Sequence, residues 1–239
     1  MNRMKSLQAL SCAMLLLAAV GCSNPADHVP AASVGKALDA GAAPTSGGQP
    51  FKFGPDSGSI EFVGSKVTGS HNGGFRNFAG EFHVANGRVT DSGNRIVIDA
   101  SSLWADDNRL TGHLKTADFF NVGQFPTATF VTTSVKQSNG DATITGDLTL
   151  HGVTKSISFP AKIGVTGNAV DVTAEFAINR FDFEIIYPGK ANDLIRKEVV
   201  LKLKVKAAPG KADFNAVERP SKQGKRMPRP KRGRTIIAA

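Results

Sequence analysis

The chain has 239 residues, 41% of them hydrophobic, and a formal net charge of +9, a composition typical of a globular protein. The charge is local, because residues 209–239 hold nine basic residues against Asp213 and Glu218, whereas residues 51–208 hold 17 basic and 16 acidic residues. The net charge therefore does not indicate a nucleic-acid-binding domain. With only Cys12 and Cys22, a cysteine-rich metal site and a disulfide framework are excluded.

Residues 1–21 have the pattern of an export signal. Arg3 and Lys5 precede an apolar run of 14 residues, Leu7–Val20, which is shorter than the roughly 20 residues that cross a bilayer. Small residues before Cys22 resemble a bacterial lipoprotein processing site, so we expect cleavage there and a lipid on that cysteine. An ordinary secretory signal with a chance cysteine is the alternative. Because Ser23 follows instead of aspartate, analogy with lipoprotein sorting predicts an outer-membrane location facing the periplasm.

Composition divides the exported part into three segments. Residues 22–50 are rich in Ala, Gly, Pro and Ser without apolar periodicity, which predicts a lipidated flexible tether. Residues 51–208 are patterned throughout and are long enough to form one domain with a sizeable core. Residues 209–239 combine basic residues with prolines, which predicts a disordered tail. The tail has the charge to contact anionic lipid or envelope polymers, and a solvated extension without a partner is the alternative.

Apolar and polar residues alternate with a period of two within the domain, as in strands that bury one face. The alternation is clear in four stretches and weaker in four others. Turn sequences rich in glycine separate many of them. Because closure removes exposed sheet edges, we expect an all-β fold, an antiparallel barrel of about eight strands. The clear stretches are 142–151, 157–165, 170–179 and 199–207, the weaker ones are 59–68, 76–84, 88–100 and 127–136, and the turns are 71–74, 86–87, 139–140, 151–152 and 167–168.

Residues 108–120 interrupt the alternation. Leu110, Leu114 and Phe120 recur at helical spacing, and Asp106 or Asp107 can cap the start of a helix. We therefore expect one short helix that packs over an end of the barrel.

The interior of an eight-stranded barrel is either filled by side chains or holds one small ligand. The predicted inward face mixes large apolar residues with Ala142, Gly146, Ala161 and Ala174. Small residues leave free volume for a hydrocarbon chain, whose burial contributes about 0.8 kcal/mol per methylene. A packed core in which small and large residues complement each other fits the same pattern. Periodicity alone leaves both possibilities open.

Five motifs occur in order along the domain, and together they resemble the YceI-like family of bacterial lipid-binding proteins over about residues 59–206. The resemblance implies a lipocalin-like barrel, a helical insertion at the place expected above, and a lumen that in some members holds a polyisoprenoid chain. The chain departs from the family at Glu184, where glycine is common, and lacks the histidine-containing first strand of many members. The motifs are Gly64-Ser65-Lys66-Val67-Thr68-Gly69, His113-Leu114-Lys115-Thr116-Ala117-Asp118-Phe119-Phe120, Phe125-Pro126-Thr127-Ala128-Thr129-Phe130, Gly146-Asp147-Leu148-Thr149-Leu150-His151-Gly152-Val153-Thr154-Lys155 and Asn179-Arg180-Phe181-Asp182-Phe183.

From the pattern and the resemblance we expect an envelope protein that carries or senses one apolar ligand, such as an isoprenoid, a quinone or an acyl chain. Arg180, near Asp182, is the best polar candidate, either in a structural ion pair or as a contact to a ligand head group. The alternative is an envelope interaction protein with a packed barrel, which binds anionic surfaces through its tail. The residues expected to line the lumen are Phe62, Phe120, Phe130, Ile144, Gly146, Leu148, Ile157, Phe159, Ala174, Phe176, Ile178 and Phe183.

No pattern of residues predicts catalysis, a metal site or a cofactor. The domain's histidines, His71, His83, His113 and His151, lack the spacing of metal ligands, such as two histidines one helical turn apart. Helix capping explains the adjacent carboxylates Asp106 and Asp107. The chain has no Gly-x-Ser-x-Gly elbow, and we therefore expect a binding protein and not an enzyme.

Overall fold

The computed structural model describes residues 24–37 and 47–218. The predicted signal, Cys22 and residues 219–239 of the predicted tail lie outside the described residues. None of the helices in the described ranges has both the length and the apolar character to cross a membrane. The elements are η1 Pro25–His28, β1 Ser33–Lys36, β2 Gln49–Phe53, η2 Pro55–Ser57, β3 Gly58–Lys66, β4 Gly69–Phe75, β5 Phe78–Ala85, β6 Arg88–Val89, β7 Arg95–Asp99, η3 Ala100–Ser102, β8 Leu103–Ala105, α1 Asn108–Leu114, β9 Thr127–Ser138, β10 Asp141–Leu150, β11 Val153–Thr166, β12 Ala169–Asn179, η4 Arg180–Phe183, β13 Gly189–Lys190, β14 Asp193–Pro209 and α2 Asn215–Glu218.

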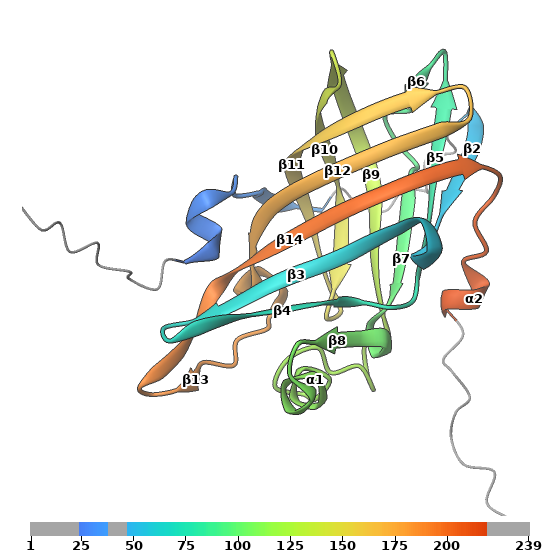
Figure 1. The fold of residues 1–239 in the computed structure, drawn as a ribbon. Coiled ribbons are helices and arrows are strands. Elements are labelled where there is room, and N and C mark those ends of the chain that lie inside the picture. The colour runs from blue at the N-terminus through green and yellow to red at the C-terminus, as the bar shows by residue number, and fades with distance from the viewer. Residues whose placement is uncertain (1–23, 38–46, 219–239) are drawn as a thin grey trace, which may run out of the picture.

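Eight strands close into an antiparallel barrel (Figure 1). Their order around the ring is β11, β10, β9, β7, β5, β2, β14 and β12, and β12 pairs with β11 to complete the ring. A side branch of β3, β4 and β8 continues from β14, and α1 lies beside β8 below one end of the barrel (Figure 1). The predicted all-β barrel with a short helical insertion is confirmed.

Local sequence accounts for the strands and for three of the hairpins. Along β12, Val172, Ala174 and Phe176 are buried, whereas the intervening Thr173 and Glu175 are exposed. At the predicted turns 86–87, 139–140 and 151–152, both residues have positive φ values. Such values are typical of the tight hairpin turns that match the twist of antiparallel strands.

The first half of the domain differs from the expectation in several places. β2 and β8 were not expected as strands, and β2 lies in the ring whereas β3, the expected strand 59–68, lies on the side branch. Gly73 and Gly74 lie inside β4 and not in a turn. A Cβ atom on Gly73 would stand 2.6 Å from the Trp104 carbonyl oxygen, so glycine is needed for the close approach of β4 to β8. The strand expected over 88–100 is divided into β6 and β7, because the buried side chain of Asn94 bonds to the Thr90 carbonyl and the Thr132 hydroxyl.

The expected helix is shorter than predicted. Asp107 caps it as expected, since its carboxylate accepts a hydrogen bond from the Leu110 amide at 2.7 Å. The helix ends at Leu114 instead of Phe120. The next residues form turns, in which Asn121 takes a φ of 44°.

The predicted flexible tether is wrong for residues 24–37. β11 and β12 pair only over residues 162–166 and 169–173, and β1 pairs with residues 155–158 of β11 where β12 has diverged. On β12, the Ala177 carbonyl accepts a bond from the Ala32 amide at 2.8 Å, and the Ala177 amide donates to the Pro30 carbonyl at 2.9 Å. Residues 30–36 therefore lie between the free edges of β11 and β12 and extend the barrel wall.

The predicted disordered tail is wrong for residues 209–218. Val217 of α2 is only 4% exposed and packs with Ala79 and Val97 of β5 and β7. Arg95 is ion-paired with Glu218. The C-terminal segment therefore covers an apolar patch on the outside of the barrel, where Val97 is fully buried.

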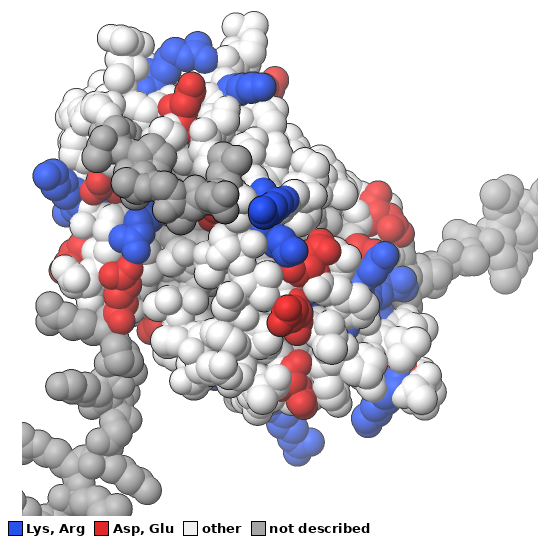
Figure 2. Space-filling model, turned by 180° about the vertical axis from the view of Figure 1, so that it is seen from behind, with Lys and Arg blue, Asp and Glu red and all other residues white. Residues whose placement is uncertain are grey.

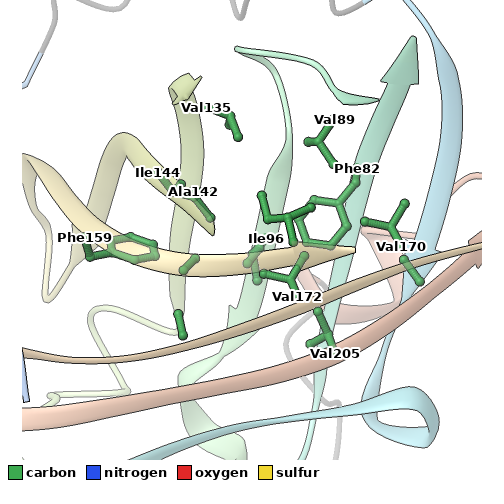
Figure 3. Close-up of a cluster of buried hydrophobic side chains, with 14 of the residues drawn as sticks. Phe82, Val89, Ile96, Val135, Ala142, Ile144, Phe159, Val170, Val172 and Val205 are labelled. Carbon is green, nitrogen blue, oxygen red and sulfur yellow. The ribbon is translucent and has the colours of Figure 1, made fainter. Parts of the chain in front are cut away.

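One half of the barrel interior is filled by side chains (Figure 3). Phe53 and Phe82 stack there with their ring centroids 4.9 Å apart, among the buried Val170 and Val172. Gly80 lies directly against the Phe53 ring, where a Cβ atom would overlap the ring. In this half, small residues provide room for aromatic rings, as close packing requires.

Candidate functional site

The other half of the barrel contains a cavity of about 450 Å³, a volume within the range of small-molecule sites. Strands of the barrel, the β3–β4 hairpin, α1 and the segment between η4 and β14 all contribute to its wall. Most of the lining side chains are aliphatic or aromatic. The polar ones include Lys66, His71, Lys190 and Asp193, on the β3–β4 and β13–β14 hairpins, and we call this end of the cavity its mouth.

Single strands contribute to both the packed half and the cavity. In β10, Leu148 lines the cavity, whereas Ile144 belongs to the packed half. In β12, Phe176 lines the cavity and Val172 does not. Phe159 of β11 stacks on Phe176 with a centroid separation of 4.0 Å, so this ring pair forms part of the cavity wall next to the packed half.

Eight of the twelve residues expected in the lumen line the cavity, and so does Arg180. Whether they touch a ligand stays a prediction. The eight are Phe62, Phe120, Phe130, Leu148, Ile157, Phe159, Phe176 and Ile178.

The other four, Ile144, Gly146, Ala174 and Phe183, lie outside the cavity. The expectation that Gly146 leaves free space is wrong, because a Cβ atom there would stand 2.5 Å from Cζ of Phe130. Ile144 and Ala174 are buried in the packed core, and so is Phe183, which is fully buried on η4. The packed-core explanation is therefore correct for Ala174, which is buried in the packed half, and for Gly146, where the Phe130 ring occupies the space.

Sequence reasoning missed many lining residues. For β7 and β14 the period-two pattern could have identified them. Ile96 and Ile98 lie two residues apart on one face of β7, and Val199, Leu201 and Leu203 share one face of β14 in the same way. For the other missed residues only the tertiary structure shows that they meet at the cavity. The missed apolar and aromatic residues are Ile60, Phe75, Ile96, Ile98, Leu110, His113, Leu114, Phe119, Ala128, Leu150, Ile185, Tyr187, Ile195, Val199, Leu201 and Leu203.

The end of the cavity next to α1 is lined by aromatic side chains that contact one another. His113 of α1 meets the rings of Phe119 and Tyr187 edge-on, with centroid separations of 5.1 and 5.2 Å. Phe62 and Phe75 of β3 and β4 have centroids 6.0 Å apart. Edge-to-face aromatic pairs stabilise by about 0.5–1.5 kcal/mol beyond the area they bury. These contacts hold α1 and the η4–β13 segment together over the apolar lumen.

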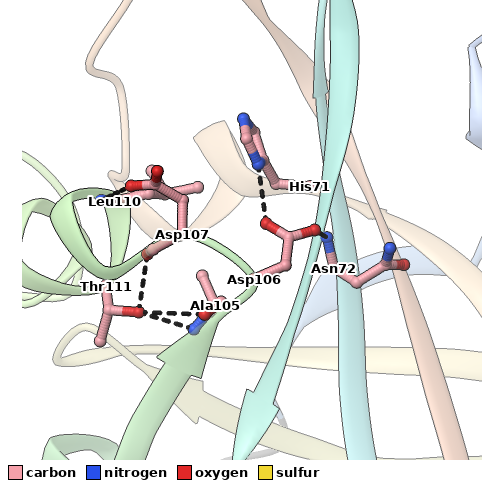
Figure 4. A network of polar contacts seen from close by, with 7 residues as sticks. All are labelled: His71, Asn72, Ala105, Asp106, Asp107, Leu110 and Thr111. Atoms are coloured by element: carbon pink, nitrogen blue, oxygen red, sulfur yellow. Dashed lines mark hydrogen bonds and ion pairs between the residues drawn. The ribbon is translucent and has the colours of Figure 1, made fainter.

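Asp106 joins the α1 segment to β4 (Figure 4). Its carboxylate accepts a hydrogen bond from the Asn72 backbone amide at 2.7 Å and lies 2.8 Å from Nδ1 of His71. The bond from Asn72, and to a lesser degree the contact with His71, lower the pKa of Asp106 below its ordinary value.

Asp106→Asn should therefore weaken the fold at neutral pH but not in acid. Because the folded pKa lies below the unfolded one, the ionised carboxylate stabilises the fold above the unfolded pKa of about 3.9. This stabilisation is lost as the pH falls through the lower folded pKa. The side chain is 40% exposed, so the loss at pH 7 should stay below about 1 kcal/mol. Urea unfolding of both proteins over a descending pH series measures it, and a difference that persists unchanged in acid would contradict the assignment.

Arg180 is only 4% exposed, and its guanidinium donates to four backbone carbonyl oxygens. The acceptors are Ile185 at 2.5 Å, Tyr187 at 2.8 Å, Arg196 at 3.1 Å and Ile195 at 3.3 Å. Burial lowers its pKa. Four of its five donors thus tie η4 to the segment that follows it, at Ile185 and Tyr187, and to β14, at Ile195 and Arg196. The structure places Arg180 in this role and not in the ion pair with Asp182, and a contact to a ligand head group stays a prediction.

Each of the domain's histidines has its own partner. In the described ranges, no three His, Cys, Asp or Glu side chains come together as a metal site. On the face shown in Figure 2, basic and acidic residues are interspersed without a broad area of one sign. The histidine partners are Asp106 for His71, Glu81 for His83, Asp118 for His113 and the Phe183 carbonyl for His151.

Comparisons with known proteins agree on one family. The model of the YceI-like domain matches residues 51–207. A UPF0312 protein of Pseudomonas putida is 34% identical over 135 residues, which cover 53% of this chain and 70% of the relative. Protein YceI of Escherichia coli is 38% identical over 91 residues, which cover 38% of this chain and 48% of the relative.

Two solved structures share the fold. BcnA of Burkholderia cenocepacia matches with a TM-score of 0.55 and 21% identity, over 63% of this chain and 96% of that chain. A domain from Saccharophagus degradans, described as a polyisoprenoid-binding domain implicated in plant cell wall breakdown, matches with a TM-score of 0.54 and 17% identity, over 66% of this chain and 98% of that chain.

Proposed function

This chain belongs to the YceI-like domain family, and we propose that it holds one apolar chain-like molecule inside its barrel as a carrier or sensor. One observation carries the proposal, namely the cavity of about 450 Å³ with its apolar lining in a barrel that is otherwise packed. A largely apolar lining favours an apolar ligand, because binding removes apolar surface from water. An isoprenoid, a quinone tail or an acyl chain has the matching chemistry, and the polyisoprenoid-binding description of the Saccharophagus degradans domain supports this class.

The alternative function requires a fully packed barrel that acts only through its basic tail, and the cavity does not fit that requirement. Half of the barrel is packed, but the other half is hollow. Residues 219–239, which hold eight of the nine basic residues of the predicted tail, lie outside the described residues. We therefore treat binding of anionic surfaces by the tail as a separate property.

Organic extraction of the purified full chain, followed by mass spectrometry, tests the proposal directly. We expect one class of apolar molecule in an amount that approaches one molecule per chain. Adding back the extracted molecule to delipidated protein should raise the melting temperature, since a ligand at 100 times its Kd stabilises by about 2.7 kcal/mol. If nothing is extracted, and if farnesol and palmitate also leave the melting temperature unchanged, the proposal is wrong.

We further propose that the protein is exported and anchored in the outer membrane through a lipid on Cys22, facing the periplasm. Small residues before Cys22 and the serine after it support this. Cys22→Ser should abolish lipid attachment and leave the signal uncleaved or the protein released. Metabolic labelling with a tagged fatty acid, followed by fractionation, measures both effects. Equal labelling of the two proteins would contradict the anchor.

A further inference from the structure

The exposed apolar side chains of this protein gather at the mouth of the cavity. In the described ranges, five large apolar residues are exposed, and four of them are Val67 (51%), Phe181 (44%), Ile186 (66%) and Leu194 (50%). Each is the neighbour in sequence of a residue that lines the cavity, as Val67 is of Lys66 and Leu194 is of Ile195. At this end, successive residues thus alternate between the cavity and the solvent.

Two adjacent hairpins carry Val67 and Leu194, and Ile186 lies in the segment that leads into the second hairpin. The β3–β4 turn lies beside the β13–β14 hairpin (Figure 1), and the Val67 amide donates to the Leu194 carbonyl at 3.1 Å. Asp193 fixes the two hairpins to each other, because it is ion-paired with Lys66 and accepts bonds from the amide and hydroxyl of Thr68. We call residues 66–69 and 186–197 the rim.

The rim is basic as well as apolar. It contains Lys66, Lys190, Arg196 and Lys197 against the single carboxylate of Asp193, a net charge of +3, although Lys66 is ion-paired with Asp193 and Lys197 with the adjoining Glu198. On the adjoining η4 and its end, Asp182 and Glu184 are acidic. Apolar side chains flanked by basic ones are typical of surfaces that insert shallowly into anionic bilayers.

We propose that the rim docks on an anionic lipid bilayer, so that the mouth of the cavity faces the membrane. The apolar side chains stand on hairpins beside the cavity mouth, which suits insertion between lipid head groups. Docking there gives an apolar molecule a path from the bilayer to the lumen that avoids water. The transfer of an apolar ligand rests on the proposed function. Docking on the bilayer does not, because the ligand-free protein should dock as well.

Vesicle binding by two charge-matched variants tests the docking. Both are made in a chain that starts at Ser23 and contains every described residue, so that neither a lipid on Cys22 nor an uncleaved signal contributes. The parent in this test is the same chain without further changes. The rim variant is Ile186→Asp/Leu194→Asp. The control is Asn139→Asp/Asn168→Asp, which adds two negative charges in the exposed β9–β10 and β11–β12 turns at the packed end.

With vesicles of phosphatidylglycerol and phosphatidylethanolamine, we expect the rim variant to bind about tenfold or more weakly than the parent, since two apolar contacts with the bilayer are lost. The control should bind within about twofold of the parent, and the difference should persist at high salt, where exposed charges are screened. Equal binding by the two variants would overturn the proposal and point to the basic tail. No vesicle binding by the parent would overturn it as well and point to a protein partner of the rim.

A second readout separates the failure of docking from the failure of the proposed function. Dansyl-labelled farnesol added from solution should bind the rim variant as it binds the parent. Transfer of the same probe from vesicles should be slower for the rim variant alone. If the parent does not bind the probe, the isoprenoid cargo is wrong, while the vesicle measurement still decides the docking. Equal transfer rates for all three proteins would contradict a membrane-facing mouth.

Discussion

Ala128→Leu should deprive the cavity of its ligand while the barrel stays folded. Ala128 is buried on β9, lines the cavity, and pairs with Ile98 of β7, which also lines it. A larger side chain at this position extends into space that the ligand would occupy. Because Ala128 lines a cavity and not the packed core, the larger side chain meets few others, and the free energy of unfolding of the ligand-free protein should change by less than about 1.5 kcal/mol.

Ala174→Leu is the matched control, since the same change is made in the packed half. There the new side chain overpacks the core, which typically costs about 1–3 kcal/mol. For a domain of this size, each kcal/mol lowers the melting temperature by roughly 2–4 °C. The ligand bound per folded molecule should be unchanged.

Mass spectrometry of extracted lipid together with melting curves distinguishes the two variants. We expect lost ligand with a retained fold for Ala128→Leu, and a lowered melting temperature with retained ligand for Ala174→Leu. The cavity is not the binding site if Ala128→Leu keeps its full ligand content. If both variants lose stability alike, the space at Ala128 is closed in solution.

Val217→Asp should detach the C-terminal segment from the barrel. The change places a carboxylate in the apolar contact with Ala79 and Val97, where a charge is costly. Losing the burial of one such side chain costs about 1.5–3 kcal/mol, and the loss cannot exceed the docking free energy of the segment. Ala216→Asp is the control, because Ala216 is exposed on the same turn of α2 and surface changes are usually within about 0.5 kcal/mol.

Two truncations extend this test. Ending the chain at residue 208 should destabilise the barrel more than Val217→Asp does. It exposes Val97, and it also removes Pro209, which pairs with Phe51 of β2, and the hydrogen bond from the Gly210 amide to the Pro50 carbonyl. A chain that ends at residue 218 keeps the contacts of Arg95 with Glu218 and of the Ala212 amide with Glu81. It should therefore unfold at the same urea concentration as the full chain. Equal stabilities of the two truncations would show that residues 209–218 do not contribute to the fold.

Much of the fold could be predicted from the sequence, because strand alternation and hairpin turns depend on residues that are neighbours in the chain. The side chains of a strand alternate between its faces, so β10 and β12 were predicted within one residue at each end. β11 and β14 begin four and six residues before the predicted stretches. Hairpin turns depend on two residues with positive φ, and Asn139-Gly140 and His151-Gly152 carry that signal themselves. Glu184 shows the converse. It stands where the family commonly has glycine, and its φ of 59° is left-handed, so the position that departs from the family is also one where the backbone favours glycine.

Alternation identifies which face of a strand points inward, but not where along the barrel the interior is empty. That depends on rings from strands far away in the chain, since Phe53 and Phe82 fill the half where Ala142 and Ala174 lie. The two added segments escaped prediction for other reasons. β1 is held by backbone hydrogen bonds between strands whose divergence no local pattern shows, and the short α2 offers one buried residue, too few for any periodicity to reveal. The sequence alone thus determined most of the barrel strands and their inward faces, but not β1, β2 or β4. Only the packing of distant segments decided which half of the barrel is hollow.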